Sequence, residues 1–295
     1  MRKCIVTTTI NNITEASKKF SLMPDWDFVV AGDIKTPHQD YKNNENITYL
    51  DPQKQEMLDK PLSDMIGWKC IQRRNMAFVY ALQNGYDIIA TVDDDNIPYD
   101  NWGQLYNQNV VKEYTNDKIF FDPLSVTNYK YLWHRGFPIQ HVHNKNENIS
   151  FEMKNIDKFD VQANLWDGDP DIDAIGRMIY NPECKFDTNE WYTTDKLTVF
   201  NSQNTIIKRD ALKHYFMFDK VGRMDDIFGS YILQKKGFNV VFGPPTVYQA
   251  RNEHDLTVDL VKEYIGYENV RNIYESDDFV PKDAYNRYVS ICSSL

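Results

Sequence analysis

Residues 86–95 read Tyr-Asp-Ile-Ile-Ala-Thr-Val-Asp-Asp-Asp, an apolar run that ends in three consecutive aspartates. The run is short and rich in β-branched residues, which predicts a buried strand. Alternate residues of an extended segment point the same way, so Asp93 and Asp95 can face one ligand. Adjacent carboxylates repel one another unless a cation neutralises them. The pattern therefore favours a site for Mg²⁺ or Mn²⁺, which prefer oxygen ligands, over an ordinary charged turn.

Upstream of this segment, predicted strands and helices alternate. Residues 64–84 carry apolar side chains at spacings of four and seven, which predicts a helix that stops at Asn84-Gly85. Earlier strands are predicted at residues 4–10, 27–33 and 47–50, with a helix at residues 14–20. Such alternation predicts an α/β fold with a mostly parallel central sheet flanked by helices. Ligands of these sheets bind beyond the carboxyl ends of the strands, where we expect the three aspartates.

The second half of the chain is less regular. Residues 120–194 are rich in Asn, Asp, Trp and Tyr, and we interpret them as loops and short elements that cover a site. Further strands are predicted at residues 197–200, 205–207 and 239–242, and further helices at residues 224–235 and 255–276. The sequence contains no internal repeat, low-complexity tract or linker. We therefore expect a single domain over residues 1–295.

The composition excludes several classes of protein. The net charge of −10 argues against a nucleic-acid partner and against adsorption to an anionic membrane, because both need basic surface. The chain has no run of about 18 apolar residues and no signal-peptide pattern, so we predict no integral membrane segment. The four cysteines are scattered without paired spacing, which indicates reduced thiols. We expect a cytoplasmic protein.

Two further places in the chain are candidates for chemistry. Asp225 and Asp226 open the helix predicted at residues 224–235, where a carboxylate either caps the helix or acts as general base on a hydroxyl group. His254 lies at a predicted strand-to-helix junction, where it either completes a carboxylate metal site or stands in a surface loop. The residues alone leave both alternatives open.

Candidates for nucleotide binding are few. Thr8 and Asp33 lie at the ends of the first two predicted strands, and Asp33 either accepts a hydrogen bond from a base or ribose or is a turn residue. Lys69, Arg73 and Arg74 lie on the predicted helix before the aspartates, where they either reach a base or phosphate or form a solvated face. An acidic protein that binds phosphate must supply such cations locally.

Seven segments, taken together, resemble one family. They are residues 29–37 (VVAGDIKTP), 68–81 (WKCIQRRNMAFVYA), 91–96 (TVDDDN), 165–174 (LWDGDPDIDA), 201–204 (NSQN), 223–227 (RMDDI) and 249–255 (QARNEHD). The segments run in order from residue 29 to residue 255 and look like the core of the STELLO-type glycosyltransferases. They are more distantly similar to the reversibly glycosylated polypeptides, which are UDP-arabinopyranose mutases.

The resemblance implies a GT-A fold, which is a Rossmann-like fold that binds nucleotide sugars. Residues 1–100 would form the nucleotide-binding half, and residues 101–295 the sugar- and acceptor-binding half with a C-terminal helix. The implied ligands are Mn²⁺ or Mg²⁺ and a nucleotide-sugar donor, for which a UDP-sugar is the first expectation. Asp93, Asp95 and His254 would hold the metal, and Asp93 and Asp94 would lie at the donor diphosphate.

The resemblance also implies roles in the second half of the chain. Asp226, beside Asp225, falls where many inverting members of the fold keep the catalytic base. The sugar and acceptor would be bound by a set of aromatic, acidic and amide residues: Trp166, Asp167, Asp169, Asp171, Asp173 and Asn204. Arg177 is a candidate for the arginine that becomes glycosylated in the mutases.

These observations predict a metal-dependent glycosyltransferase, for a hexose or a pentose, that uses a glycan or another hydroxyl acceptor. Direct displacement with Asp226 as base would invert the anomeric configuration, while a retaining enzyme would need the same metal site. One alternative is a mutase that interconverts ring forms of a nucleotide sugar. Another is a non-catalytic subunit that binds nucleotide sugars, although such a subunit has no reason to keep a whole acidic site. The oligomeric state is left open.

Overall fold

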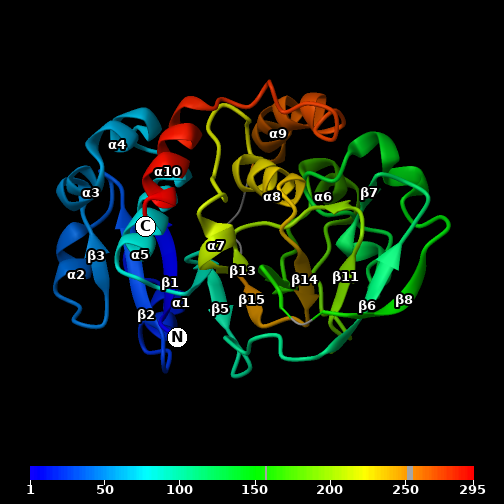
Figure 1. Ribbon diagram of the computed structural model, residues 1–295, viewed down its shortest axis with the longest axis horizontal. Helices are drawn as coiled ribbons and strands as arrows, with labels where there is room; N and C mark the ends of the chain where they lie inside the picture. The colour runs from blue at the N-terminus through cyan, green and yellow to red at the C-terminus, as the bar shows by residue number, and fades with distance from the viewer. Residues whose placement is uncertain (157, 251–254) are drawn as a thin grey trace.

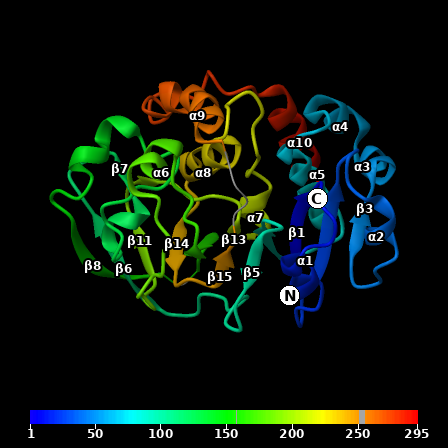
Figure 2. The ribbon, with the colours of Figure 1, turned by 180° about the vertical axis from the view of Figure 1, so that it is seen from behind.

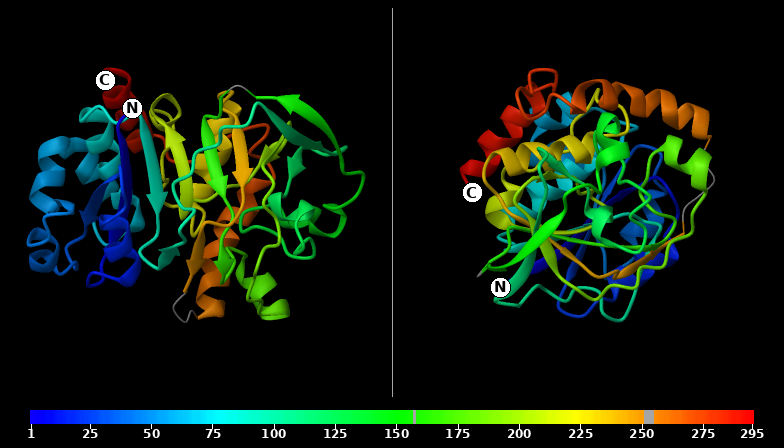
Figure 3. Two further views of the ribbon diagram at one scale, coloured as in Figure 1. Left: turned by 90° about the horizontal axis from the view of Figure 1, so that it is seen from below. Right: turned by 90° about the vertical axis from the view of Figure 1, so that its right-hand side faces the viewer.

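The computed structural model describes residues 1–156, 158–250 and 255–295. Its centre is a ten-stranded sheet with the strand order β3-β2-β1-β4-β13-β9-β14-β11-β6-β8. Figure 1 shows the N-terminal strands on the left and later strands on the right, and Figure 3 (left) shows the sheet extending across the width of the molecule. No helix in the described ranges is long and apolar enough to cross a membrane.

The first half of the sheet is parallel. Its strands are β1 (Lys3–Thr9), β2 (Asp27–Gly32), β3 (Thr48–Leu50) and β4 (Ile88–Val92). Each pairs in parallel with its neighbour in the sheet. The helices between them are α1 (Glu15–Ser21), α2 (His38–Lys42), α3 (Pro52–Leu58), α4 (Lys60–Ile66) and α5 (Arg74–Gln83).

The second half of the sheet is mixed. Its strands are β13 (Asn204–Lys208), β9 (Val161–Asn164), β14 (Val240–Gly243), β11 (Tyr192–Thr194), β6 (Val110–Thr115) and β8 (Ser150–Asn155). Only the pairs β9–β14 and β11–β6 are parallel here, so five of the nine neighbouring pairs of the whole sheet are parallel. The predicted α/β fold with a mostly parallel central sheet is confirmed.

Residues 120–194 form loops and short elements, as expected from the sequence, but one of these elements does not cover a site. β9, within this segment, lies in the middle of the sheet between β13 and β14. It has only four residues, all buried, and the sequence Val-Gln-Ala-Asn mixes polar and apolar side chains. The Gln162 amide accepts a hydrogen bond from the Tyr106 backbone and donates to the carbonyl oxygen of Gln104 and to the side-chain oxygen of Asn164. A strand with buried amides carries no alternating pattern that could have revealed it.

Smaller elements complete the fold. Beside the main sheet lie β5 (Asn96–Pro98), β10 (Asp167–Gly168) and β15 (Val247–Gln249) in one small sheet, and β7 (Phe120–Phe121) and β12 (Leu197–Thr198) in another. The later helices are α6 (Ala174–Tyr180), α7 (Arg209–Leu212), α8 (Asp225–Lys235), α9 (Leu256–Val270) and α10 (Asp283–Ser293). Figures 1 and 2 both show α9 and α10 in the upper part of the view with α8 below α9, and α10 packs against α4 and α5 of the first half.

The prediction of a single helix over residues 64–84 was wrong, because a loop interrupts the helical path. α4 ends at Ile66, Gly67 has a left-handed φ of 73° and Lys69 one of 65°. The helical path resumes in a 3₁₀ turn at Ile71–Arg73 and then α5. The Asp33 carboxylate explains the break, since it accepts hydrogen bonds from the backbone N–H groups of Lys69 (2.7 Å) and Cys70 (3.2 Å). The helix predicted at residues 255–276 likewise ends earlier, at Val270.

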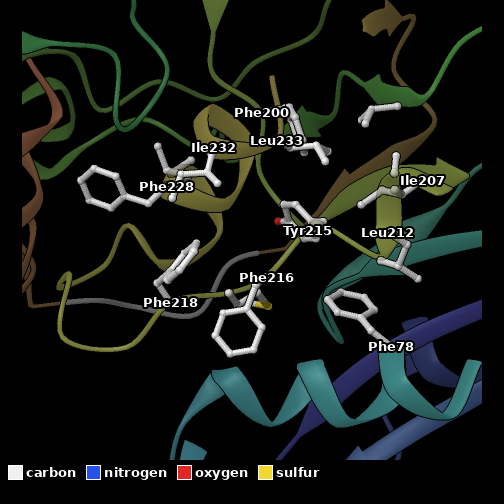
Figure 4. Close-up of a cluster of buried hydrophobic side chains, with 14 of the residues drawn as sticks. Phe78, Phe200, Ile207, Leu212, Tyr215, Phe216, Phe218, Phe228, Ile232 and Leu233 are labelled. Atoms are coloured by element: carbon white, nitrogen blue, oxygen red, sulfur yellow. The ribbon is translucent and has the colours of Figure 1, made fainter. Parts of the chain in front are cut away.

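The segment before α8 is embedded in the hydrophobic core. Figure 4 shows Tyr215, Phe216 and Phe218 between α8 and α5, with Phe78 of α5 and Phe228 of α8 on either side. The α8 backbone approaches this segment so closely that a Cβ on Gly229 would lie 2.4 Å from the Phe216 carbonyl oxygen. The core therefore fixes the start of α8, which carries Asp225 and Asp226, against the first half of the chain.

Truncation of this core should reduce stability sharply. Phe216 is 2% exposed and packs on the rings of Phe218 and Tyr288. We expect Phe216→Ala to lower the free energy of unfolding by about 3–5 kcal/mol, since it removes a buried ring and leaves a cavity. The matched control Phe151→Ala, at a ring that is 52% exposed, should cost less than about 1 kcal/mol. Urea unfolding of both variants checks this, and similar losses in the two would contradict it.

Candidate active site

Two adjoining cavities lie beyond the carboxyl end of β4. The first, here called the acidic cavity, has a volume of about 300 Å³ and is lined by carboxylates that include Asp93, Asp95, Asp225 and Asp226. The second, here called the side cavity, has a volume of about 230 Å³, and Asp94 contributes to its wall. Ile71 lines both cavities. Asp171 also lines the acidic cavity, so three segments far apart in sequence contribute its carboxylates.

Asp93 is held by a buried guanidinium. Its Oδ1 accepts a hydrogen bond of 2.6 Å from Arg74, which is 1% exposed. Arg74 also donates to the Ser202 carbonyl oxygen (3.0 Å) and hydroxyl group (2.9 Å). Burial raises the pKa of Asp93, against the opposing effect of the Arg74 charge. Arg74 therefore keeps a desolvated carboxylate in place at the cavity wall.

Asp94 and Asp95 differ in their surroundings. The Asp94 carboxylate accepts hydrogen bonds from the Thr9 hydroxyl and from the Asn11 side chain (3.0 Å), which ties it to the end of β1. Asp95 lines the acidic cavity, and its carbonyl oxygen accepts from the backbone of Ala250 at 3.2 Å. Asp93 and Asp95 are thus the members of the triplet that line the acidic cavity, while Asp94 lines the side cavity.

The first two residues of α8 have unequal contacts. The Asp226 carboxylate accepts hydrogen bonds from the Ser202 backbone (2.9 Å), the Ser202 hydroxyl (3.1 Å) and its own neighbour Ile227 (2.9 Å), and it pairs with Arg135 at 3.4 Å. Oδ2 of Asp225 is buried and has no hydrogen-bond partner among the described residues. Burial, and after it the Asp226 charge, raises the pKa of Asp225 to about 7. A carboxyl group with that pKa can exchange a proton near neutral pH.

Arg135 is a member of the site that the sequence analysis missed. Its guanidinium bonds Asp171 through Nε (2.8 Å) and a terminal nitrogen (3.0 Å), and it also reaches Asp226. Burial lowers its pKa, but Asp171 and Asp226 outweigh this effect and raise the pKa well above the usual range. Arg135 stands in an irregular segment with no motif around it, so no signal in the sequence marks it.

Three residues predicted for nucleotide binding line the side cavity, and one does not. Thr8, Asp33 and Lys69 are on its wall. The Asp33 carboxylate already bonds the backbone of the loop at Gly67–Cys70, so it shapes this cavity. Arg73 is fully buried, donates to Gln55 (2.8 Å) and stacks 3.7 Å from the centre of the Trp68 ring. The structure therefore brings Arg73 to neither cavity.

Most of the side chains predicted to bind the sugar and the acceptor contact other groups inside the protein. Of the segment 166–173, Asp171 lines the acidic cavity. Asp173 is fully buried, caps α6 and accepts from Tyr267 (2.6 Å) and Trp133 (2.7 Å), and burial raises its pKa. The others contact internal groups: Trp166 packs on the His134 ring, Asp167 accepts from Tyr99 and Phe186, Asp169 pairs with Arg177, and Asn204 bonds Trp102 and Thr246.

Two of the three residues predicted to hold a metal line the same cavity. Asp93 and Asp95 both line the acidic cavity, whereas His254 lies outside the residues that the structure describes. Within the described ranges, no group of three or more His, Cys, Asp or Glu side chains is arranged to hold a metal ion. The two carboxylates supply hard oxygen donors of the kind that Mg²⁺ and Mn²⁺ bind together with phosphate oxygens and water. The residues present therefore fit such an ion bound jointly with a phosphate ligand.

Comparison with known proteins finds one curated relative. No family model matches the chain. The chain is 22% identical over 273 residues to "Probable glycosyltransferase STELLO2" of Arabidopsis thaliana, and the match covers 84% of this chain and 35% of that protein. The family resemblance predicted from the sequence is thus confirmed as a similarity. The chain spans about a third of the length of this relative.

Two solved structures show a partial likeness. The mannosyltransferase PcManGT from Pyrobaculum calidifontis, in complex with GDP-Man and Mn²⁺, aligns with a TM-score of 0.43 and 11% identity, over 98% of this chain and 68% of that chain. TarS residues 1–349 of S. aureus, in complex with UDP-GlcNAc, align with a TM-score of 0.40 and 14% identity, over 87% of this chain and 61% of that chain.

The raised pKa of Asp225 predicts a pH-dependent stability difference. Because the folded carboxyl group holds its proton more tightly than the unfolded group, the stability it gives at low pH is lost as the pH rises from 3.8 to about 7. Asp225→Asn has no such loss, so its free energy of unfolding should increase relative to wild type across this window and then level off. Urea unfolding at several pH values checks this, with Asp100→Asn at an exposed position as control. A difference that does not change with pH would show that Asp225 titrates as an ordinary carboxyl group.

Proposed function

We propose that this protein is a divalent-metal-dependent glycosyltransferase that moves a sugar from a nucleotide-sugar donor to a hydroxyl group of a glycan or similar acceptor. The observation that carries the proposal is that Asp93 and Asp95 line the same cavity as the pair Asp225–Asp226. A site for a metal-bound diphosphate and a site for a proton acceptor therefore adjoin. The similarity to STELLO2, named a probable glycosyltransferase, over 84% of the chain supports the same reaction.

The donor would span both cavities. The side cavity, with Asp33, Lys69 and Thr8 on its wall, would take the nucleoside. The diphosphate would lie at Asp93–Asp95, between the side cavity and the acidic cavity, and the sugar would enter the acidic cavity. A UDP-sugar is the first donor to test. Lys69 is the cation among the described residues of the side-cavity wall, and it would approach the phosphate, because Arg73 is buried elsewhere and Arg74 is engaged with Asp93.

A divalent cation would be held by the aspartates together with the donor diphosphate. Asp93 and Asp95 would hold it, and Arg74 would keep Asp93 oriented through the bond to Oδ1. When bound, Mn²⁺ or Mg²⁺ would offset the negative charge that builds on the departing nucleoside diphosphate. The protein carries a net charge of −10, so a diphosphate in this acidic cavity needs a nearby cation more than it would in a basic protein.

Asp225 is the better proton acceptor of the pair at the start of α8. The sequence analysis favoured Asp226, but that carboxylate already accepts three hydrogen bonds and pairs with Arg135. Asp225 has one oxygen without a hydrogen-bond partner among the described residues and a pKa of about 7, close to the optimum for a general base near neutral pH. Asp226 would position Ser202 and α8. Direct attack by the deprotonated acceptor would invert the anomeric centre.

Chelation should abolish donor binding if a metal is shared by Asp93 and Asp95. A thermal-shift screen of UDP-, GDP-, CMP- and dTDP-sugars identifies the donor, since binding to the folded state raises the melting temperature. Calorimetry with that donor should show binding with Mn²⁺ or Mg²⁺ and none in excess EDTA. Asp95→Asn should behave like EDTA, and the exposed control Asp100→Asn like wild type. Equal affinity with and without EDTA would sink the metal assignment.

Loss of the proton acceptor should reduce turnover but preserve donor binding. Asp225→Asn keeps the size of the side chain, so donor affinity should stay while kcat falls by roughly 10²–10⁴-fold. Below a pH of about 7, wild-type kcat should decline as Asp225 becomes protonated. Asp226→Asn disturbs the contact with Ser202, so it should lower stability as well as activity. An Asp225→Asn enzyme with wild-type kcat, or a product that retains the donor's anomeric configuration by NMR, would refute this assignment.

A further inference from the structure

The last strand of the main sheet is exposed along its whole length. β8 (Ser150–Asn155) follows β6 at one end of the strand order, and no described strand pairs with its outer edge. Figures 1 and 2 both show β8 at the outer border of the molecule, beyond β6. All six of its residues are exposed, and Phe151 and Met153 are 52% and 60% exposed. An open edge of this kind is a template for pairing with a further strand.

The ladder between β6 and β8 determines which backbone groups of β8 point outward. One step beyond the paired strands, the Ile156 N–H donates to the Asn109 carbonyl oxygen at 3.1 Å. Hydrogen-bonded and non-hydrogen-bonded pairs alternate along an antiparallel ladder, so the even-numbered residues of β8 bond β6. The N–H and C=O groups of Phe151, Met153 and Asn155 therefore point away from the sheet. A strand that adds to this edge would bond these three residues.

β8 lacks the usual protection of an edge strand. Proteins protect exposed edges with proline, with bulges, with very short strands or with lysines whose charge a neighbouring strand would bury. Residues 150–155 read Ser-Phe-Glu-Met-Lys-Asn, without proline, and their register with β6 is unbroken. The lysine of this segment, Lys154, stands two residues from Glu152, on the same face of the strand. The edge thus carries a charge pattern that a suitable strand can match.

A second copy of β8 matches this pattern in one register. In an antiparallel pair related by a two-fold axis, directly opposite residues share a face, so the pair is centred on a residue. A centre at Met153 places Glu152 opposite Lys154 of the second copy, and Lys154 opposite Glu152 of that copy. A centre at Glu152 or Lys154 instead places like charges opposite one another, which is destabilising. Centres nearer the ends of β8 would pair fewer residues. Charge complementarity therefore selects the register centred on Met153.

The same register offsets a repulsion within the sheet. Glu152 lies directly opposite Glu113 of β6, which is 8% exposed, and Lys154 forms an ion pair with Glu113. In the register centred on Met153, Lys154 would lie between Glu113 of its own chain and Glu152 of the second copy. On the outer edge, residues 152 and 154 occupy non-hydrogen-bonded positions, where opposite side chains approach most closely. Each of the two symmetric ion pairs would therefore compensate a like-charge contact.

We propose that two copies of this chain associate through β8, as an antiparallel strand pair centred on Met153 that joins their sheets. A two-fold axis between the strands reverses the strand direction, so the acidic cavities of the two copies would lie at opposite borders of the joined sheet. Each copy would keep its own site, and the inference does not rest on the proposed function. One strand pair buries less than the standard interface of about 1,600 Å², so we expect a reversible dimer with a Kd of about 1–100 µM.

Sedimentation equilibrium of the full chain between about 1 and 300 µM tests the proposal. The wild-type protein should pass from monomer to dimer across this range. Met153→Pro removes an outward N–H group and leaves the ladder with β6 intact, so it should fold and stay monomeric. Lys154→Pro, which removes an N–H group that bonds β6, should instead lower the melting temperature. The control Glu45→Lys, at an exposed position just before β3 at the opposite end of the sheet, should dimerise like wild type.

Exchange of the two charges tests the register. Lys154→Glu and Glu152→Lys each place like charges opposite one another at both symmetric positions, so each should raise the Kd of the homodimer about 10-fold or more. An equimolar mixture of the two variants restores both ion pairs between the copies. The mixture should therefore form a heterodimer with a Kd within about threefold of the wild-type value.

Three outcomes would overturn the inference. The first is a wild-type protein that stays monomeric throughout, which would leave this edge to a strand of another protein. The second is a dimer that persists in Met153→Pro, because the copies would then meet through another face. The third is a mixture that dimerises no better than Lys154→Glu or Glu152→Lys alone, because the register centred on Met153 would then be wrong. Donor binding by calorimetry should be equal in the wild type, Met153→Pro and Glu45→Lys, so its failure would count against the proposed function alone.

Discussion

The buried guanidinium of Arg74 connects the two halves of this protein. Arg74 opens α5 in the parallel half, and it bonds Asp93 at the end of β4 and both oxygens of Ser202, just before β13. β4 and β13 are also the strands at which the sheet changes from parallel to antiparallel. A buried charge is tolerated only when its partners are in place, and removal of one partner costs about 3–5 kcal/mol. The carboxylate of the site and the junction of the sheet therefore depend on one another.

A second buried arginine repeats this arrangement from the other side of the acidic cavity. Arg135 holds Asp171 and Asp226, and Asp226 in turn bonds Ser202, which Arg74 also contacts. Ser202 thus lies between two arginine–aspartate pairs. In an acidic protein, the two cations stabilise the carboxylates that shape the cavity. Among the residues that the structure describes, one Asp225 oxygen has no hydrogen-bond partner, and burial together with the Asp226 charge raises the pKa of this carboxyl group to about 7.

The first half of the fold could be predicted from the sequence because its strands are continuous β-branched runs. β1, β2 and β4 were each predicted within a few residues, and their parallel order follows from the helices between them. The error at residues 64–84 has a tertiary cause. The apolar spacing continues through the loop, but the Asp33 carboxylate bonds backbone N–H groups 36 and 37 residues away. Periodicity within a segment contains no information about such a distant partner. For the same reason β9, with its buried amides, was missed.

The residues of the candidate site could likewise be predicted from the sequence only in part. Asp93, Asp95, Asp225 and Asp226 could be named from the sequence, since each stands at the end of a strand or the start of a helix. The sequence could not show which of the two adjacent aspartates, Asp225 or Asp226, keeps its proton. The partners that distinguish them are Ser202 and Arg135, which lie 24 and 91 residues away from Asp226. Adjacent positions on a helix point about 100° apart. The Asp226 carboxylate therefore accepts three hydrogen bonds and pairs with a cation, whereas among the described residues Oδ2 of Asp225 has no hydrogen-bond partner. Burial in these surroundings, and after it the Asp226 charge, is the reason for the raised pKa of Asp225.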